Sequence, residues 1–229
     1  MNAITQPGVS VIDAIYQRHS VRGFRPDPVP ADTLQRVFEQ AQQAPSNCNT
    51  QPWKVLVASG ALRDSLRQGF LDRARAGLPQ TPDFSYVGTF EGDYRTRQVA
   101  CAVALYGEMG IERGDREGRL RAARRNFEFF DAPHVAFLCM DRSFGATIAV
   151  DVGIYVQTLM LAMQANGIGS CAMGSLRAYP DLVRDAFGVD DRLGVLFGLC
   201  FGYEDPGVAA NRTRTDRESV SDAVVFRDR

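Results

Sequence analysis

The chain has 229 residues, 45% of them hydrophobic and 23% charged, so it can bury a substantial core and is not expected to be disordered. Because 26 Lys and Arg residues stand against 27 Asp and Glu residues, the formal net charge of -1 argues against nucleic acid or an anionic membrane as a partner. The two histidines and five cysteines do not have the spacing typical of metal ligands, which argues against a metal site. The odd number of cysteines and the lack of a secretory signal pattern indicate a cytoplasmic protein.

The first part of the chain is predicted to form two helices and a strand. A capping-box pattern opens the first helix, whose Val11, Ile12 and Ile15 we expect to face inward. The second helix is expected over residues 30–44, between two prolines. A polar loop then leads into a short β-branched strand at residues 54–58.

The middle of the chain is predicted to be mostly helical. Ser59 can cap a helix with apolar residues at helical spacing, whereas residues 77–93 show no period. Such a long irregular stretch is usually functional or mobile. Two further helices are predicted over about residues 94–109 and 115–129, followed by a strand over residues 135–140.

Residues 146–165 are apolar nearly all round, which predicts a helix that is buried on most faces. The segment is long enough to cross a membrane, but an internal Asp151 and two glutamines favour a core or dimer-interface helix. Beyond it, a short helix is predicted over residues 180–187 and a buried strand over residues 193–203. The chain ends in an Arg-rich tail with a short apolar run at residues 220–226.

Few strands and no regular alternation of helices and strands predict an α+β fold. One string, Gly167-x-Gly169-x-x-Ala172, matches a dinucleotide-binding motif. That motif requires a strand before the glycines and a helix after them, whereas these glycines follow a predicted helix, so we reject it. Motifs for P-loop, zincin and α/β-hydrolase chemistry are also absent from the sequence.

Three polar clusters and the tail have the composition that an anionic, planar ligand needs. Residues 18–22 offer guanidinium and hydroxyl groups for a phosphate, although a solvated helix end would look the same. Residues 45–53 form a proline-bounded polar loop, which could be a simple turn. Residues 167–175 have mostly small side chains, so their backbone could come close to a ligand; the alternative is a plain helix-to-strand connection. The tail adds Arg212, Arg214 and Arg217, which could equally be surface charges.

In their order along the chain and in their amino-acid sequences, these clusters resemble the FMN-dependent nitroreductase family over about residues 10–225. The matching segments read RHSVR from Arg18, PVP from Pro28, APSNCNTQPW from Ala44, GIGSCAMG from Gly167, and RTDR from Arg214. The pair Tyr94-Arg95 and residues 126–133 are most similar to members that reduce nitroaromatics such as nitrobenzoates.

The resemblance implies a nitroreductase-like α+β fold with a central, mostly antiparallel sheet flanked by helices. It implies one domain over residues 1–229, paired in an intertwined homodimer, with an extension at about residues 205–229 that wraps around the partner. FMN would bind at the interface. The cofactor-binding residues that it implies are Arg18, His19, Ser20, Arg22, Pro45, Ser46, Asn47, Asn49, Ala172, Met173, Gly174, Ser175, Arg214 and Arg217.

Within this set the resemblance assigns separate roles. Arg18, Ser20 and Arg217 would hold the phosphate and ribityl chain, with Arg214 or Arg212 assisting. Arg22 would lie near flavin N1 and O2, and the backbone N–H of Gly174 would reach N5. The Pro45 loop would come from the other subunit.

The implied activity is reduction of nitroaromatics to hydroxylamines, or of quinones, with NAD(P)H as donor in a ping-pong cycle. Because flavin carries the reaction, no catalytic side chain is needed. Tyr94, Phe127 and Phe130 are candidates for the acceptor pocket, with core packing as the alternative for the two phenylalanines. A flavin or ene reductase, a dehalogenase and a flavin-binding dimer without turnover remain as alternatives.

Overall fold

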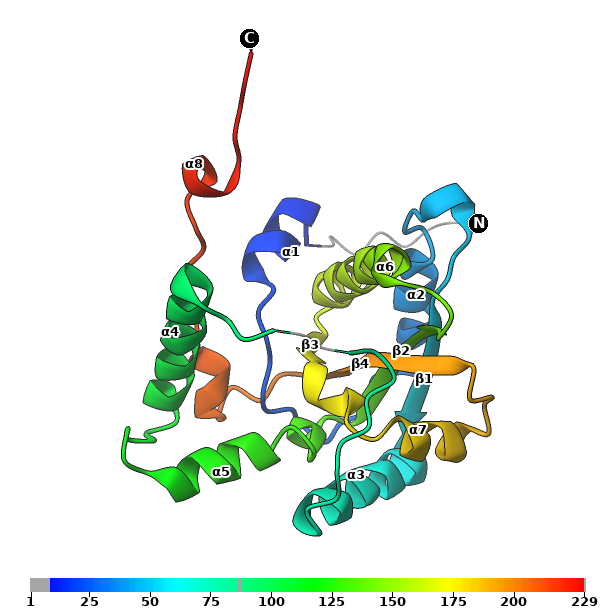
Figure 1. Cartoon of the computed structure of the whole chain (residues 1–229), viewed down its shortest axis with the longest axis horizontal. Coiled ribbons are helices and arrows are strands. Elements are labelled where there is room, and N and C mark those ends of the chain that lie inside the picture. The colour runs from blue at the N-terminus through cyan, green and yellow to red at the C-terminus, as the bar shows by residue number, and fades with distance from the viewer. Residues whose placement is uncertain (1–8, 86–87, 229) are drawn as a thin grey trace.

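The computed structural model describes residues 9–85 and 88–228, and within them one antiparallel sheet has the strand order β1-β2-β4-β3. Helices cover both faces of this sheet, as the α+β prediction requires (Figure 1). The strands are β1 (Lys54–Ser59), β2 (His134–Asp141), β3 (Gly169–Met173) and β4 (Leu193–Gly202). The α-helices are α1 (Val11–Gln17), α2 (Ala31–Ala41), α3 (Gly60–Arg75), α4 (Gly92–Glu108), α5 (Arg116–Arg124), α6 (Ala146–Ala165), α7 (Pro180–Phe187) and α8 (Val220–Ala223).

β2 and β4 form the centre of the sheet. Every residue of β2 from His134 to Met140 is buried, because β1 and β4 flank it and helices cover it. β3 was not predicted as a strand, since its sequence GSCAM contains no β-branched residue. It becomes a strand through pairing with the last five residues of β4. The prediction for residues 167–175 therefore missed an edge strand next to the candidate site.

Two apolar clusters hold the layers together. Val37 of α2 packs with Leu159 and Met163 of α6 on one face of the sheet, and Phe70 of α3 packs with Val183 of α7 on the other. α6 has the predicted bounds, and Gly188 ends α7 in a left-handed conformation (φ 60). The order of helix α6 before Gly169 and strand β3 after it agrees with our rejection of the dinucleotide motif.

α1 and α6 are more exposed than predicted. Ser10 caps α1 as expected, but Val11, Ile12 and Ile15 are 69%, 63% and 48% exposed, and only Ala14 is buried. On α6, Val150 is 60% exposed. Periodicity correctly finds the apolar residues of these helices, but no described segment of the single chain covers this face. The inward orientation predicted for α1, and burial of most faces of α6, are therefore wrong for the isolated chain.

By length and composition α6 is also the one helix of the described residues that could cross a membrane. Core helices of soluble proteins share this length and composition. α6 packs against α2, α1 and the sheet on one side, as a helix of a folded domain does.

Beyond β3, helices α4 and α5 and the tail form an arm at one side of the sheet (Figure 1). α4 packs against η4 (Ala209–Arg212), and the C-terminal segment with α8 extends away from the body. α5 ends at Arg124, earlier than predicted. Turns follow it, and the backbone then takes left-handed conformations at Phe129, Phe130 and Asp131 (φ 54, 52 and 64).

His134 joins two layers of the fold. Its Nε2 accepts a hydrogen bond from the backbone N–H of Val29 at 2.9 Å, and its Nδ1 lies 2.6 Å from the Ser59 hydroxyl. Ser59 therefore bonds to the histidine and does not cap α3 with its side chain, contrary to the prediction. Burial, and next the positive charge of Arg63, lower the pKa of His134, so the ring is held neutral.

Candidate functional site

Residues 18–22 run along the free edge of β3. Ser20 forms a parallel bridge with Ser170, and the N–H of Val21 donates to the Ser170 carbonyl at 3.1 Å. The first and third polar clusters of the sequence are thus brought together, although about 150 residues separate them in the chain.

The surroundings of Cys171 show that the side chains of this segment converge as well. A hydrogen bond to Cys200 and then the positive charge of Arg22 lower the pKa of the Cys171 thiol, despite burial. A hydrogen bond with Ser20 and the charge of Arg18 act in the same direction. The positive charges of Arg18 and Arg22 therefore act on one residue of β3, and guanidinium groups are suited to bind a phosphate.

Asn211 in η4 clamps the tail to this segment. The backbone N–H of Arg22 donates to its Oδ1 at 2.6 Å, and its Nδ2 donates to the carbonyls of Gly23 and Asp205 at 2.8 and 2.9 Å. The side chain is 2% exposed. Sequence reasoning missed this residue, since a single asparagine outside any motif carries no signal.

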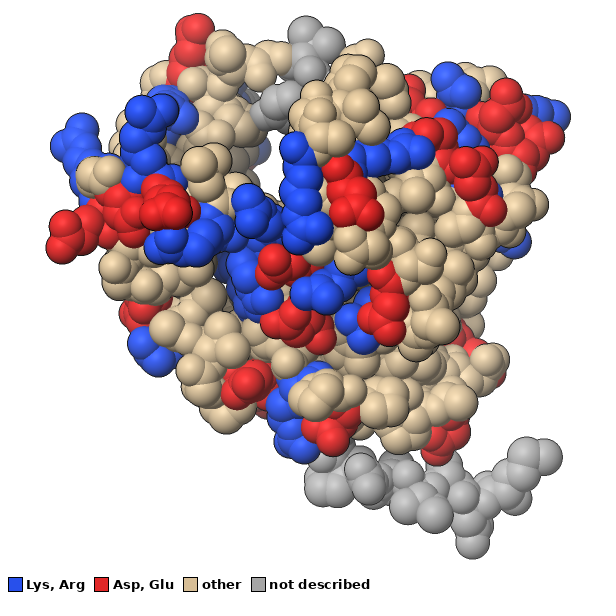
Figure 2. Space-filling view, turned by 90° about the horizontal axis from the view of Figure 1, so that it is seen from below, with Lys and Arg blue, Asp and Glu red and all other residues tan. Residues whose placement is uncertain are grey.

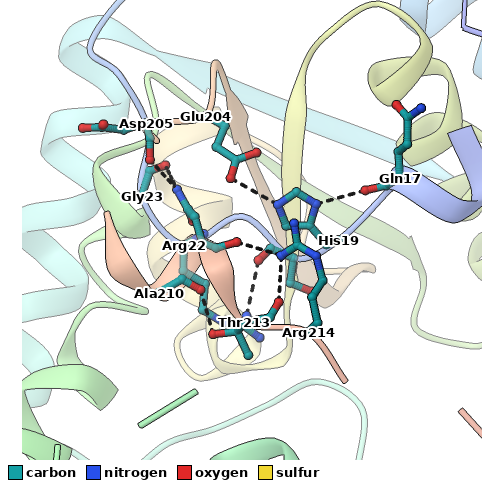
Figure 3. Close-up of polar contacts among 11 residues, drawn as sticks. Gln17, His19, Arg22, Gly23, Glu204, Asp205, Ala210, Thr213 and Arg214 are labelled. Atoms are coloured by element: carbon teal, nitrogen blue, oxygen red, sulfur yellow. Dashed lines mark hydrogen bonds and ion pairs between the residues drawn. The ribbon is translucent and has the colours of Figure 1, made fainter. Parts of the chain in front are cut away.

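The clamp brings Arg214 near the same place, as the close-up shows with Arg22 and Thr213 (Figure 3). Arg214 Nη1 donates to the carbonyls of Asn211 and Thr213 at 2.8 and 2.9 Å. Arg212 instead points to α4 and pairs with Glu108 at 2.9 Å. Of the two arginines that could assist at a phosphate, the geometry favours Arg214.

Arg217 lies further along the tail, and its Nη1 bonds locally to the carbonyl and hydroxyl of Thr215, both at 3.0 Å. It lines a small hollow of about 190 Å³ together with Arg97 and Cys101 of α4 and with Arg214. The structure therefore groups Arg217 with Arg214 beside α4.

His19 has both ring nitrogens occupied. Nδ1 lies 3.0 Å from the Gln17 carbonyl and Nε2 lies 3.2 Å from a carboxylate oxygen of Glu204, as Figure 3 shows. The ring therefore fixes the course of the chain between Arg18 and Ser20. A direct hydrogen bond from His19 to a cofactor would require one of these partners to give way.

The end of β3 offers an open backbone and unpaired hydroxyls. Space is free within 4 Å of where a Cβ of Gly174 would lie, at the start of η3 (Gly174–Arg177). The Ser170 and Ser175 hydroxyl oxygens are buried and have no hydrogen-bond partner among the described residues. The Arg18 guanidinium likewise has no hydrogen bond or ion pair with any residue that the structure describes. Buried hydroxyls without partners are costly, so this set of groups fits a polar, phosphorylated ligand such as FMN.

The second polar cluster lies elsewhere in the chain. Its loop, with η1 (Asn47–Asn49), is held at the first turns of α6, where the Asn47 N–H donates to the buried carboxylate of Asp151 at 3.1 Å. The Ser46 hydroxyl accepts from the Gln51 N–H at 2.9 Å. Pro45 and Asn49 are exposed. Figure 1 shows this loop and the β3 edge at opposite ends of α6, so one chain does not bring the two clusters together.

The three aromatic candidates have different surroundings. Phe127 lies between Phe70 and Tyr179, with ring centroids 5.8 and 6.1 Å away, which favours the core alternative for this residue. Phe130 is 4% exposed but lines a cavity beside Arg22. Tyr94 on α4 is 67% exposed, with the Arg97 guanidinium 5.0 Å from its ring centroid.

Residues 9–85 and 88–228 contain no group of three or more His, Cys, Asp or Glu side chains that could hold a metal ion. The groups that the structure places along the β3 edge are arginines, hydroxyls and backbone N–H groups.

Comparison with known proteins gives a consistent answer. The Nitroreductase family model matches residues 15–203. The chain is 43% identical to nitroreductase NfnB of Mycolicibacterium smegmatis, covering 97% of this chain and 96% of that protein, and 31% identical to 4-nitrobenzoate reductase of Pseudomonas putida, covering 93% of each. Its fold is similar to the crystal structure of the FMN-dependent nitroreductase NfnB from Mycobacterium smegmatis in complex with NADPH, with a TM-score of 0.89 and 42% identity over 93% of this chain and 96% of that one. The chain belongs to the nitroreductase family.

Proposed function

We propose that the protein is an FMN-dependent oxidoreductase that uses NAD(P)H to reduce nitroaromatic compounds or related small acceptors such as quinones. The observation that carries the proposal is the β3 edge: Ser20 of the Arg18 segment bridges to Ser170, the hydroxyls of Ser170 and Ser175 are buried without a partner among the described residues, and the backbone at Gly174 is open. The names of the relatives, nitroreductase and 4-nitrobenzoate reductase, support the same activity.

The residues of the chain would divide the binding of FMN among them. Arg18 and Ser20, with Arg214 and Arg217 from the tail, would bind the phosphate and ribityl chain, since guanidinium forks suit phosphate oxygens. Arg22 would place a positive charge beside the pyrimidine edge of the ring. Gly174 leaves room for its backbone N–H to approach the ring closely.

Bound FMN would supply the hydride and electron chemistry that amino-acid side chains cannot supply. The protein would orient donor and acceptor in turn over the same ring face and hold the anionic oxygens by fixed charges. Ala172, Met173 and Ser175 would border the ring from the β3 edge.

The test is a visible absorbance spectrum of the purified protein before and after addition of NADPH or NADH without oxygen. We expect a flavin spectrum that bleaches with the donor and returns when a nitroaromatic acceptor is added, with hydroxylamine as product. A protein that does not bind added FMN would contradict the proposal, as would bound FMN that no donor reduces.

The working unit that we propose is a homodimer in which the loop with Pro45, Ser46, Asn47 and Asn49 reaches the FMN site of the partner. Three features support it: the loop lies away from the β3 edge of its own chain, α1 and α6 expose apolar side chains, and the tail extends from the body with Phe226 82% exposed. Large exposed apolar surface is typical of an interface. The extension at about residues 205–229 would wrap around the partner.

Subunit mixing tests this arrangement directly. We would unfold and refold together an Arg18→Ala chain and an Asn47→Ala/Asn49→Ala chain, each inactive alone. If the two clusters come from different chains, heterodimers contain one intact site, and about a quarter of the wild-type activity should return. Mixing Arg18→Ala with Arg22→Ala is the matched control and should restore nothing, because one chain supplies both. Absence of recovery in the first mixture, with heterodimers present, would contradict the shared site.

For the acceptor pocket we keep Tyr94 and Phe130 as the better candidates, with Phe127 behind them as support. We also keep the prediction that the protein works in the cytoplasm, which fits five cysteines that are all unpaired in the structure.

A further inference from the structure

A cavity of about 770 Å³ lies between α4, α5 and η4. Arg22 lines it on one side, and Arg121, Arg124 and Arg125 line it from α5 and the turn that follows. Against these four arginines the lining contains one acidic residue, Glu128. Seen from below the view of Figure 1, the molecule has Lys and Arg side chains gathered around an opening in its surface (Figure 2).

The arginines of the cavity differ in how far they are already paired. Arg125 binds Asp131 at 2.6 Å and Glu128 at 3.0 Å, and although burial acts to lower the pKa of Arg125, these two carboxylates raise it overall. Arg125 is therefore committed to the fold. Glu128 is already paired with Arg125, so it is not a partner for the other arginines of the cavity.

Arg121 and Arg124 are available for a ligand. Arg121 has only long contacts to Asp115 and Glu117, at 3.9 and 3.6 Å, and it is 64% exposed. Such exposed pairs contribute little and are readily exchanged for a better partner. The Arg124 guanidinium has no hydrogen bond or ion pair within the described residues.

Most of the remaining lining is apolar. Leu105, Met109 and Ile111 line the cavity from α4 and the turn beyond, Phe130 and Val208 complete the apolar part, and Asn126 is the neutral polar side chain among the lining residues. A site with an apolar wall and guanidinium forks at its edge fits a flat ring that carries an oxyanion.

We propose that Arg121 and Arg124 form an oxyanion-selecting site, which takes the carboxylate or phosphate group of an aromatic molecule whose ring lies in this cavity. The inference rests on the proposed function, because Arg22 would connect the cavity to the flavin ring. Two reactants have this chemistry: an acceptor such as a nitroaromatic carboxylate, and NADPH through the 2'-phosphate that NADH lacks. The test separates them.

The experiment compares the Arg121→Gln/Arg124→Gln protein with the wild type and with Arg116→Gln. Arg116 is exposed on the same helix and lies outside the cavity lining, so it controls for the loss of charge from α5. On oxidised, FMN-loaded protein we would titrate 4-nitrobenzoate against nitrobenzene, and NADP+ against NAD+, and measure dissociation constants without turnover. Steady-state KM values are then measured for the two nitro compounds and for NADPH and NADH.

We expect the double variant to bind one of the two anionic ligands about tenfold more weakly, with a much smaller change for its neutral or unphosphorylated counterpart. A selective loss with 4-nitrobenzoate assigns the site to the acceptor, and a selective loss with NADP+ assigns it to the donor. The wild-type preference for the anion should also weaken at high salt, and Arg116→Gln should behave like the wild type.

Three results would overturn the inference. Equal changes within both pairs would mean that the arginines do not select charge. Loss of FMN from the double variant would mean that they hold the cofactor, and dissociation of a dimer in size-exclusion chromatography would mean that the partner chain fills the cavity. If the wild type itself bound no FMN or failed to oxidise NAD(P)H, the proposed function would fail instead, so the two failures can be told apart.

Discussion

Residues 18–22 and the loop at residues 45–51 are both polar, yet the fold holds them by different kinds of bond. The first segment is paired to the sheet by its backbone and clamped by Asn211. The second has no strand partner and depends on side chains, with Asp151 accepting from the Asn47 N–H. Its backbone is also strained, because Cys48, Asn49 and Gln51 are left-handed (φ 48, 56 and 47).

The difference indicates what each segment requires. Backbone pairing tolerates changes of side chain, so residues 18–22 can vary their contacts to a ligand while staying in place. A loop with three strained residues keeps its conformation only while its few side-chain bonds hold. Strain of this kind is common at functional sites, and here it lies in the loop that we assign to the partner's FMN.

The largest effect is expected from breaking the clamp of the first segment. Asn211→Ala removes three hydrogen bonds and leaves the part-buried N–H of Arg22 without its acceptor, while the carbonyls of Gly23 and Asp205 keep only the backbone N–H groups of Asp205 and Val208 as donors. We expect the free energy of unfolding to fall by about 3 kcal/mol, measured by urea denaturation, together with weaker FMN binding.

The matched control is Asn126→Ala, which loses one local hydrogen bond to the Ala123 carbonyl and should cost less than about 1 kcal/mol. If the Asn211 and Asn126 variants were equally stable, the tail would not be what fixes the first segment, and the comparison of the two segments would lose its basis.

An intermediate effect is expected from releasing the second segment. Asp151→Ala leaves the Asn47 N–H without its acceptor and allows the strained loop to relax. We expect the dissociation constant of FMN to rise about tenfold, with little change in the fold of the β3 edge. Fluorescence titration of the apoprotein with FMN measures it.

Asp151→Asn is the informative partner of this variant, because its amide oxygen can still accept from Asn47. Rescue of FMN affinity by asparagine would show that Asp151 acts as a positioning residue for the loop. If alanine and asparagine weakened binding equally, the role of Asp151 would be one of charge, and if neither did, the loop would not need this bond.

The sequence predicted the elements whose signals are local. The bounds of α6 and α7 follow from apolar composition and terminal glycines, and the order of the polar motifs identified the family. Three features could not be predicted from local patterns. β3 exists only because β4 and residues 18–22 pair with it, Asn211 bonds to Gly23 across 188 positions of sequence, and the apolar face of α1 does not reveal which chain covers it.

The smallest effect is expected at His134, whose hydrogen bond to Val29 belongs to neither polar segment. Changing the protonation of His134 therefore tests whether residues 18–22 and the loop at residues 45–51 stay intact while overall stability changes. The pKa of His134 lies below its ordinary value of 6.5, first because of burial and then because of Arg63. Between the two pKa values the unfolded chain binds the proton more readily than the folded chain. The stabilisation is therefore complete above pH 6.5 and is lost as the pH falls below it.

We expect less than about 1 kcal/mol of this loss by pH 6, since one proton changes stability by at most about 1.4 kcal/mol per pH unit. His134→Gln removes the titration while a side-chain oxygen can still accept from Val29, so urea denaturation should show a flatter pH dependence for the variant. Asp181 does not interfere with this measurement. Burial acts to raise the pKa of its carboxyl, but Arg73 outweighs burial and lowers the pKa from 3.8, so Asp181 changes stability only at pH values below that of the experiment.

An identical slope for wild type and variant between pH 7 and 5 would mean that His134 does not carry the proton linkage. FMN affinity that fell in parallel with stability would mean that the two segments depend on the core beneath them and are not held independently.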